Sequence, residues 1–175
     1  MNDLKILITY FSNTGNTEKV AKSIKEGLEG NDVDLIPVSN MDASKLGMYD
    51  LVLLGSGIYA SRIEKSLMKL VKDATPDLPS KFVYFCTHAS LDFYQKPFYT
   101  ITKILAEHGC RVIDEFDCVG DNIGIPLETR LKMLEKLPDD KKKKAQEDME
   151  KIKGRPNQED LNKAKQFGQN LLKKV

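Results

Sequence analysis

The sequence predicts an α/β fold in which helices cover both faces of a parallel sheet. Five short apolar segments, rich in β-branched and aromatic residues, alternate with segments whose apolar residues recur at helical spacing. Strands that alternate with helices are joined by crossover connections, which make neighbouring strands parallel and place the helices on the sheet. The expected strands are residues 4–11, 33–38, 51–55, 81–87 and 110–119, and the expected helices are residues 17–29, 63–72 and 98–108, followed by a closing helix after Asn157.

The strands follow from their composition and their boundaries. Residues 4–11 (LKILITYF) form an apolar, β-branched run that ends at Ser-Asn-Thr-Gly. In residues 33–38, Pro37 indicates an edge position, because proline has no N–H to donate to a neighbouring strand. Residues 51–55 (LVLLG) are apolar throughout, as expected for a central parallel strand that is buried on both faces.

The helices are predicted from an apolar stripe and from their ends. Apolar residues share one face of residues 17–29, which Gly30 terminates, and of residues 98–108, which Gly109 terminates. Asn157 is a favourable N-cap for the closing helix, whose first turn carries acidic residues.

The length of 175 residues suits one domain, residues 1–175, with a charged insert at about residues 120–154 before the closing helix. We expect one or two short helices in this insert. Its basic run, Lys141–Lys144, is flanked by acidic residues and is therefore typical of a solvated helix face rather than of a binding patch.

The composition excludes several classes of protein. Lys plus Arg is 27 and Asp plus Glu is 26, so the formal net charge of +1 gives no general attraction to nucleic acid. Three cysteines without a C-x-x-C pair predict reduced thiols and a cytoplasmic location. We expect no signal peptide and no integral membrane segment, since no run reaches the roughly 18 apolar residues that a span needs.

The most informative segment joins the first strand to the first helix. A helix N-terminus presents backbone N–H groups and positive partial charge, hydroxyl and amide side chains add neutral donors, and glycine allows close approach of the backbone. The segment contains no Lys or Arg, and it matches neither the triphosphate pattern G-x-x-x-x-G-K-[ST] nor the dinucleotide pattern G-x-G-x-x-G. We therefore predict a site for a dianionic monophosphate in six residues: Ser12, Asn13, Thr14, Gly15, Asn16 and Thr17.

Residues 9–18 (TYFSNTGNTE) resemble the flavin mononucleotide (FMN) phosphate loop of the flavodoxin family, whose pattern is [ST]-x-[ST]-G-x-T. The order of expected elements extends the resemblance over most of the chain. It implies a flavodoxin-like three-layer fold with a five-stranded parallel sheet in the order 2-1-3-4-5 and FMN at the switch point. Residues 57–60 and 154–157 also resemble a subgroup that includes flavodoxin-like protoporphyrinogen oxidases and flavodoxin-like proteins of anaerobes and archaea.

In flavodoxins, the loops after the third and fourth strands enclose the isoalloxazine ring. Both loops here combine small residues with an aromatic residue, which suits backbone contacts to a flat polar ring. Tyr59 is either a stacking residue or a core aromatic at the start of the next helix, and the choice between Phe93 and Tyr94 stays open. The expected ring contacts are Ser56, Gly57, Ile58, Tyr59 and Ala60 in one loop, and Thr87, His88, Ala89 and Phe93 or Tyr94 in the other.

Three functions are compatible with these residues. The first is an electron carrier that passes electrons between redox partner proteins, as a monomer or a homodimer. The second is an FMN-dependent oxidoreductase acting on a quinone or a porphyrin-type substrate, and the third is a flavodoxin-fold binding module without flavin. No catalytic acid or base is identified, two distant histidines give no metal site, and His88 is either a flavin contact or an ordinary loop residue.

Overall fold

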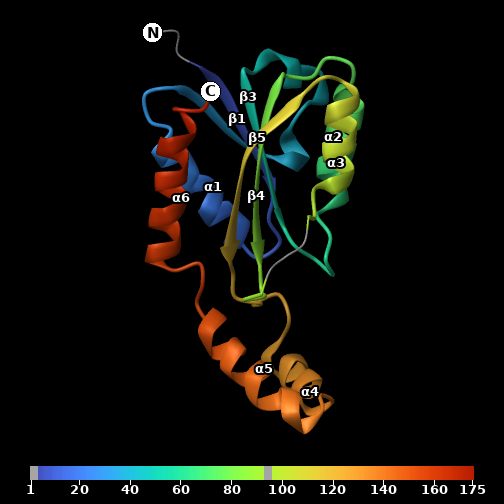
Figure 1. The fold of residues 1–175 in the computed structure, drawn as a ribbon, viewed down its shortest axis with the longest axis vertical. Coiled ribbons are helices and arrows are strands. Elements are labelled where there is room, and N and C mark those ends of the chain that lie inside the picture. Colours follow the sequence, from blue (N-terminus) through green and yellow to red (C-terminus); the bar gives the residue numbers. More distant parts are fainter. Residues whose placement is uncertain (1–3, 93–95) are drawn as a thin grey trace.

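The computed structural model describes residues 4–92 and 96–175. Five strands form one parallel sheet in the order β2-β1-β3-β4-β5 (Figure 1), which confirms the predicted topology. The order reverses between β1 and β3, as in other doubly wound sheets. The strands are β1 (Lys5–Phe11), β2 (Asp32–Pro37), β3 (Leu51–Gly57), β4 (Lys81–His88) and β5 (Arg111–Val119).

Helices lie on both faces of the sheet. Figure 1 shows α1 and α6 on one side and α2 and α3 on the other. Two 3-10 helices, η1 (Val38–Asn40) and η2 (Ala43–Met48), join β2 to β3. The α-helices are α1 (Asn16–Gly27), α2 (Lys65–Ala74), α3 (Tyr99–Glu107), α4 (Leu127–Glu135), α5 (Asp139–Ile152) and α6 (Gln158–Leu171).

Two apolar cores separate these layers, because successive strand residues point to opposite faces of a sheet. Ile6 and Ile8 of β1 belong to the core beneath α1 and α6. Leu7, between them, belongs to the core beneath α2 and α3. All seven residues of β3 are buried, so the central strand is covered on both faces, as its apolar sequence predicts.

Glycines allow two close approaches within this packed region. A Cβ atom at Gly27 of α1 would lie 2.1 Å from the Lys165 carbonyl oxygen, and one at Gly168 would lie 2.5 Å from the Ile24 carbonyl oxygen. The backbones of α1 and α6 therefore touch where both helices lack a side chain. In the sheet, a Cβ atom at Gly55 would meet the ring of Phe85 at 2.0 Å.

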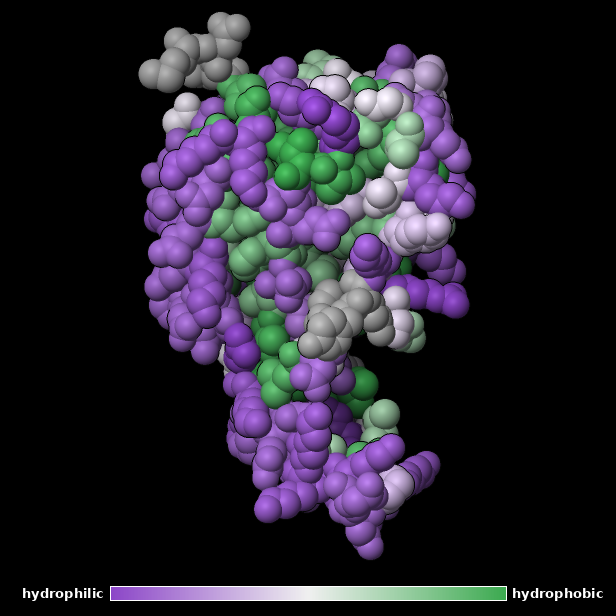
Figure 2. Space-filling view, viewed as in Figure 1, coloured by the Kyte–Doolittle hydropathy of each residue, from purple (hydrophilic) through white to green (hydrophobic). Residues whose placement is uncertain are grey.

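Residues 120–154 form a projection that we call the arm, which contains α4 and α5. Figure 1 shows the arm extending from the edge of the sheet where β4 and β5 end. The buried residues of its two helices are Leu134 and Ile152. Most of its visible surface is hydrophilic (Figure 2), although Ile123, Leu127 and Leu131 are about half exposed.

The predicted helix ends differ from the observed ones by a few residues. The helix expected over residues 63–72 is α2, which begins later, at Lys65, because Tyr59–Arg62 form a tight turn before it. The closing helix ends at Leu171. Within the described part of the chain, none of the helices is long and apolar enough to cross a membrane.

Candidate functional site

The loop between β1 and α1 contains a backbone turn that favours glycine. Gly15 precedes the first residue of α1 and has a φ angle of 91°, in the left-handed region. The Ser12 hydroxyl oxygen accepts hydrogen bonds from the N–H groups of Gly15, at 3.1 Å, and Glu18, at 3.3 Å. Ser12 therefore stabilises the helix N-terminus from within the loop, while the loop's other polar side chains line a cavity.

The cavity has a volume of about 370 Å³ and lies at the carboxyl ends of β1, β3, β4 and β5. This volume falls within the range of small-molecule sites. It opens at the point where the strand order reverses, which is where doubly wound proteins bind ligands. Its walls are Asn13, Thr14, Asn16 and Thr17; Gly57, Ile58, Tyr59 and Ala60; Thr87, His88 and Ala89; and Gly120, Asp121, Asn122, Gly124 and Ile125.

Thr87, near the end of β4, holds three of these walls together. Its hydroxyl oxygen shares a buried hydrogen bond of 2.8 Å with that of Thr17, in the first turn of α1. Its carbonyl oxygen accepts a hydrogen bond of 2.9 Å from the Ile58 N–H. The loops after β1, β3 and β4 are therefore joined to one another by direct hydrogen bonds.

Tyr59 lies across the gap between two of the loops. Its hydroxyl oxygen accepts a hydrogen bond of 3.3 Å from the Asn13 N–H, and its ring packs edge-on against Phe11 at 5.9 Å between centroids. A Cβ atom at Gly57 would lie 2.5 Å from this hydroxyl, so glycine makes room for the tyrosine. Burial raises the pKa of Tyr59, which favours its neutral form.

The loop that carries Tyr59 includes a strained turn. Tyr59 and Arg62 exchange two backbone hydrogen bonds, at 2.8 and 3.0 Å. Between them, Ala60 and Ser61 have φ angles of 46° and 68°, in the left-handed region that non-glycine residues rarely occupy. Positive φ at both central positions is the pattern of a type I′ turn. This turn, rather than the start of a helix, sets the position of Tyr59.

The fourth wall comes from the start of the arm and was not predicted from the sequence. The Asn16 side chain donates a hydrogen bond of 2.9 Å to the Asp121 carbonyl oxygen. A Cβ atom at Gly124 would lie 3.0 Å from the Thr14 methyl carbon. The segment after β5 therefore lies directly against the predicted phosphate loop. The sequence feature that could have indicated this wall is the cluster of glycine and polar residues directly after the fifth strand.

Asp121 connects this wall to both ends of the arm. Its carboxylate accepts a hydrogen bond of 2.9 Å from the Gly154 N–H and one of 3.3 Å from the Arg130 guanidinium. Its backbone N–H donates to the Arg155 carbonyl oxygen at 2.7 Å. Together with the contact from Asn16, these bonds fix the base of the arm to the rim of the cavity.

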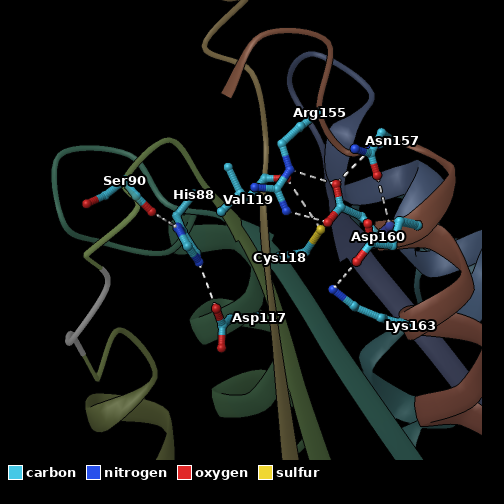
Figure 3. Close-up of polar contacts among 10 residues, drawn as sticks. His88, Ser90, Asp117, Cys118, Val119, Arg155, Asn157, Asp160 and Lys163 are labelled. Carbon is cyan, nitrogen blue, oxygen red and sulfur yellow. Dashed lines mark hydrogen bonds and ion pairs between the residues drawn. The ribbon is translucent and has the colours of Figure 1, made fainter. Parts of the chain in front are cut away.

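His88 lies at the end of β4 with only 5% of its surface exposed. Its Nδ1 atom is 2.8 Å from the Ser90 carbonyl oxygen, and its Nε2 atom is 2.9 Å from a carboxylate oxygen of Asp117 on β5 (Figure 3). The same view shows Arg155 paired with Asp160, which closes the start of α6 beside Cys118. His88 is thus a buried residue of the cavity wall, fixed by its contacts with Ser90 and Asp117, rather than an exposed loop residue.

The structure brings most of the predicted site residues to one cavity. Three of them, Ser12, Gly15 and Ser56, shape the loops without lining it. The buried Ser56 hydroxyl donates to the Gly57 carbonyl oxygen at 2.7 Å and accepts from the Glu64 N–H at 3.0 Å. Phe93 and Tyr94 lie outside the described residues, so the choice between them stays open.

The cysteines are not positioned for thiol chemistry at this site. Cys86 and Cys118 are buried, and burial raises the pKa of both thiols, that of Cys118 to about 12. A raised pKa leaves little of the nucleophilic thiolate at neutral pH.

A doubly wound α/β sheet with a cavity at its switch point, beside a helix N-terminus, is the usual architecture of a nucleotide-cofactor site. Comparison with known proteins specifies the class. A flavodoxin domain model matches residues 7–169, so the chain belongs to the flavodoxin family.

Individual relatives agree with this assignment. An uncharacterized protein of Methanocaldococcus jannaschii is 28% identical over 173 residues, which cover 97% of this chain and 99% of that protein. A probable flavodoxin of Bacillus subtilis is 48% identical over 54 residues, or 30% of this chain and 34% of that protein. A flavodoxin structure from the domain Archaea, 16% identical, covers 98% of both chains with a TM-score of 0.65 and supports the fold.

FMN is the cofactor of this family, and the chain is an FMN-binding flavodoxin-like protein. The residues present fit that cofactor. Asn13 and Thr14 bring an amide and a hydroxyl group to a helix N-terminus, and the side chains of Asn16 and Thr17, bonded to Asp121 and Thr87, line the same wall. Neutral side-chain donors beside backbone N–H groups suit a phosphate. Gly15 adopts a left-handed backbone conformation in this loop. A Cβ atom there would meet no neighbour within 4 Å, but the positive φ angle would strain the backbone of any other residue.

Proposed function

We propose that this protein is an electron carrier that receives electrons from one redox partner protein and passes them to another. Bound FMN supplies reversible one-electron and two-electron chemistry. The chain's own residues bind the phosphate, hold the ring loops together through Thr87, and leave the mouth of the cavity accessible beside the exposed Ala60. A carrier needs little beyond these functions.

The observation that carries this proposal is that the ionisable residues in the described cavity wall are bonded to other residues of the protein. The Tyr59 hydroxyl oxygen is bonded to the loop after β1, and the Asp121 carboxylate is bonded to Gly154 and Arg130. His88 is held between Ser90 and Asp117. All three are engaged by the protein itself, which suits a rigid cofactor site better than acid–base catalysis on a substrate.

A second candidate function is an FMN-dependent oxidoreductase acting on a quinone or porphyrin-type substrate. The arm favours it, because Ile125 lines the cavity and the neighbouring residues Ile123, Leu127 and Leu131 leave about half of their surface exposed. A flat apolar substrate would contact such residues. The carrier remains the first choice because the ionisable residues of the described cavity wall are already bonded within the protein.

The partners of the carrier are expected to be proteins, in a reducing compartment such as the cytoplasm. The three cysteines are free thiols, which supports that compartment. The net charge of +1 differs from that of strongly acidic flavodoxins. Long-range attraction to a basic partner is therefore weak, and we expect association rates with little dependence on salt.

Stepwise anaerobic reduction of the FMN-loaded protein tests the proposal. A carrier is reduced in two separable one-electron steps and shows no rapid turnover with NAD(P)H and a water-soluble quinone. Reduction in a single two-electron step with rapid quinone turnover would instead establish the oxidoreductase. Failure to bind FMN at all would contradict both functions.

A matched pair of variants connects this test to the phosphate loop. Thr14→Val removes a hydroxyl from the cavity wall without changing the size of the side chain, and we expect FMN affinity to fall about tenfold. Thr75→Val makes the same change at the C-terminal end of α2, and FMN affinity should stay as in the unmodified protein. Equal affinities of the two variants would exclude Thr14 from phosphate binding.

A further inference from the structure

Among the described residues, each ring nitrogen of His88 faces a hydrogen-bond acceptor. The Ser90 carbonyl oxygen, 2.8 Å from Nδ1, can only accept, and the Asp117 carboxylate, 2.9 Å from Nε2, offers acceptor oxygens (Figure 3). A neutral imidazole carries one N–H group, so it would make one of these bonds and leave its other nitrogen facing an acceptor. Only the doubly protonated ring donates to both partners.

The burial of the ring increases the difference in free energy between neutral and doubly protonated His88. The His88 side chain is 4% exposed, so water has little access to the ring, and an unmatched buried nitrogen costs free energy. Asp117 itself is 61% exposed on its side chain, which lets water stabilise the carboxylate while it holds the buried ring. The pair therefore avoids the cost of burying two charges together.

Two other carboxylates of the cavity wall and of the loop after β4 are paired with basic residues of the arm. Asp121 shares the cavity wall with His88 and is paired with Arg130 at 3.3 Å. Asp92, beyond Ser90 in the loop after β4, is paired with Lys144 of α5 at 3.2 Å. Asp117 on β5 is thus a carboxylate in direct contact with the His88 ring that forms no other ion pair among the described residues.

We propose that His88 is held as an imidazolium in the wall of the FMN cavity and thereby stabilises the reduced cofactor relative to the oxidised one. This proposal rests on the proposed function, because it concerns the same bound FMN. The phosphate loop has no Lys or Arg, so a cationic His88 supplies positive charge to the cofactor site. Two-electron reduction of a flavin with uptake of one proton adds negative charge to the ring, and a nearby cation favours that form.

The charge of His88 can be measured in the FMN-free protein. The chain has two histidines, so nitrogen-15 NMR of the imidazole rings at pH 7 gives two patterns, and His88→Gln assigns them. We expect both nitrogens of His88 to be protonated in the unmodified protein. In Asp117→Asn, an amide N–H can donate to Nε2, and His88 should lose a proton at lower pH than in the unmodified protein. An unprotonated nitrogen at pH 7 in the unmodified protein would overturn the proposal.

The effect on the cofactor is measured as the ratio of the dissociation constants of oxidised and fully reduced FMN. We expect this ratio to fall about tenfold in His88→Gln, which corresponds to about 30 mV for a two-electron couple. His108→Gln is the matched control, since its ring lies at the end of α3 and contacts the Ile104 carbonyl oxygen. The ratio should not change in this control.

The pH dependence gives an independent readout if His88→Gln folds poorly. NMR gives the pH interval over which His88 loses its second proton. In the unmodified protein, the ratio of the two dissociation constants should fall as pH rises through that interval. The fall is measured after the pH dependence of free FMN has been subtracted. An unchanged ratio across that interval, or in a folded His88→Gln, would overturn the proposal. Failure of the unmodified protein to bind FMN would instead refute the proposed function, and the NMR result would still decide the charge of His88.

Discussion

In β3 all seven residues are buried, whereas the two helices of the arm bury one residue each, Leu134 and Ile152. The sheet and its four covering helices are stabilised mainly by apolar burial, which is the largest favourable contribution to folding. The arm is held chiefly at its base, by the bonds of Asp121 to Gly154, Arg130 and Arg155. The same chain thus contains a strongly packed region and a lightly packed one.

This difference bears on the cofactor site, because the cavity lies where the two regions meet. Three of its walls belong to loops at the ends of packed strands, and the fourth belongs to the first residues of the arm. Regions with few apolar contacts open locally at a lower free energy than the core does. We therefore expect opening of the arm to expose one side of the cavity while the sheet stays folded.

Substitution at the contact between α1 and α6 should have the largest effect on the packed region. In Gly27→Ala the new Cβ atom would lie 2.1 Å from the Lys165 carbonyl oxygen, so the helices must move apart. We expect the free energy of unfolding to fall by about 3 kcal/mol, measured by urea denaturation. Lys25→Ala, on the exposed face of the same helix, is the control and should change it by less than about 0.5 kcal/mol.

The link between the arm and α6 should be sensitive to pH. Arg155 donates hydrogen bonds to the Asp160 carboxylate, which also accepts from the Asn157 N–H at 2.9 Å, and the Arg155 bond lowers the pKa of Asp160. A lowered pKa in the folded state means that the stabilisation is present above the ordinary carboxyl pKa of about 4 and is lost as pH falls through the folded-state value.

Asp160→Asn should therefore lower the free energy of unfolding by about 2 kcal/mol at pH 7, and the difference should shrink in acid below about pH 4. Denaturant titrations at several pH values measure this. Glu159→Gln, which removes an exposed carboxylate in the same turn, is the control. A difference for Asp160→Asn that did not depend on pH would contradict the assigned ion pair.

Asp121 provides the most direct way to loosen the arm alone. Asp121→Ala removes the acceptors for Gly154 and Arg130, and we expect amide hydrogen exchange in α4 and α5 to become about tenfold faster. FMN affinity should fall by a similar factor, while exchange in the strands is unchanged. Glu150→Gln, on the exposed surface of α5, should leave both quantities unaltered. Equal acceleration in the strands would show that the two regions do not open separately.

The smallest effect is expected in the turn beside the cavity. Ala60 has a φ angle of 46°, and glycine adopts such a conformation without the steric cost that alanine bears. After subtraction of the greater entropy of glycine in the unfolded chain, Ala60→Gly should stabilise the protein by about 0.5 kcal/mol. Ala106→Gly, in the helix α3, makes the same change where it should destabilise by about 1 kcal/mol.

The sequence predicted the alternating strands and helices and the phosphate loop because both depend on local patterns, whereas the strand order was implied by the resemblance to the flavodoxin family. The apolar run of residues 51–55 and Pro37 in residues 33–38 distinguish a central strand from an edge strand before any contact is known. The cluster of hydroxyl, amide and glycine residues from Ser12 to Thr17 requires only its position between a strand and a helix.

The fourth wall of the cavity was missed for a physical reason. Residues 120–154 are charged and solvated, and a solvated pattern carries no information about where its first residues pack. The carboxyl end of β5 lies at the same sheet edge as the other cavity loops, so Gly120, Asp121 and Gly124 were the residues to consider. The inward turn of the Ser56 hydroxyl likewise depends on the folded turn that brings the Glu64 N–H to it, which the local pattern does not reveal.

The central claim is that FMN binds between the three strand loops and the base of the arm. Titration of FMN into the nitrogen-15-labelled protein, followed by backbone amide NMR, tests it most directly. We predict saturable shifts in residues 13–17, 57–60 and 87–89 and, with the same dissociation constant, in residues 120–125 of the arm. Saturable binding that shifted the strand loops but left residues 120–125 unchanged, or no binding at all, would contradict this account.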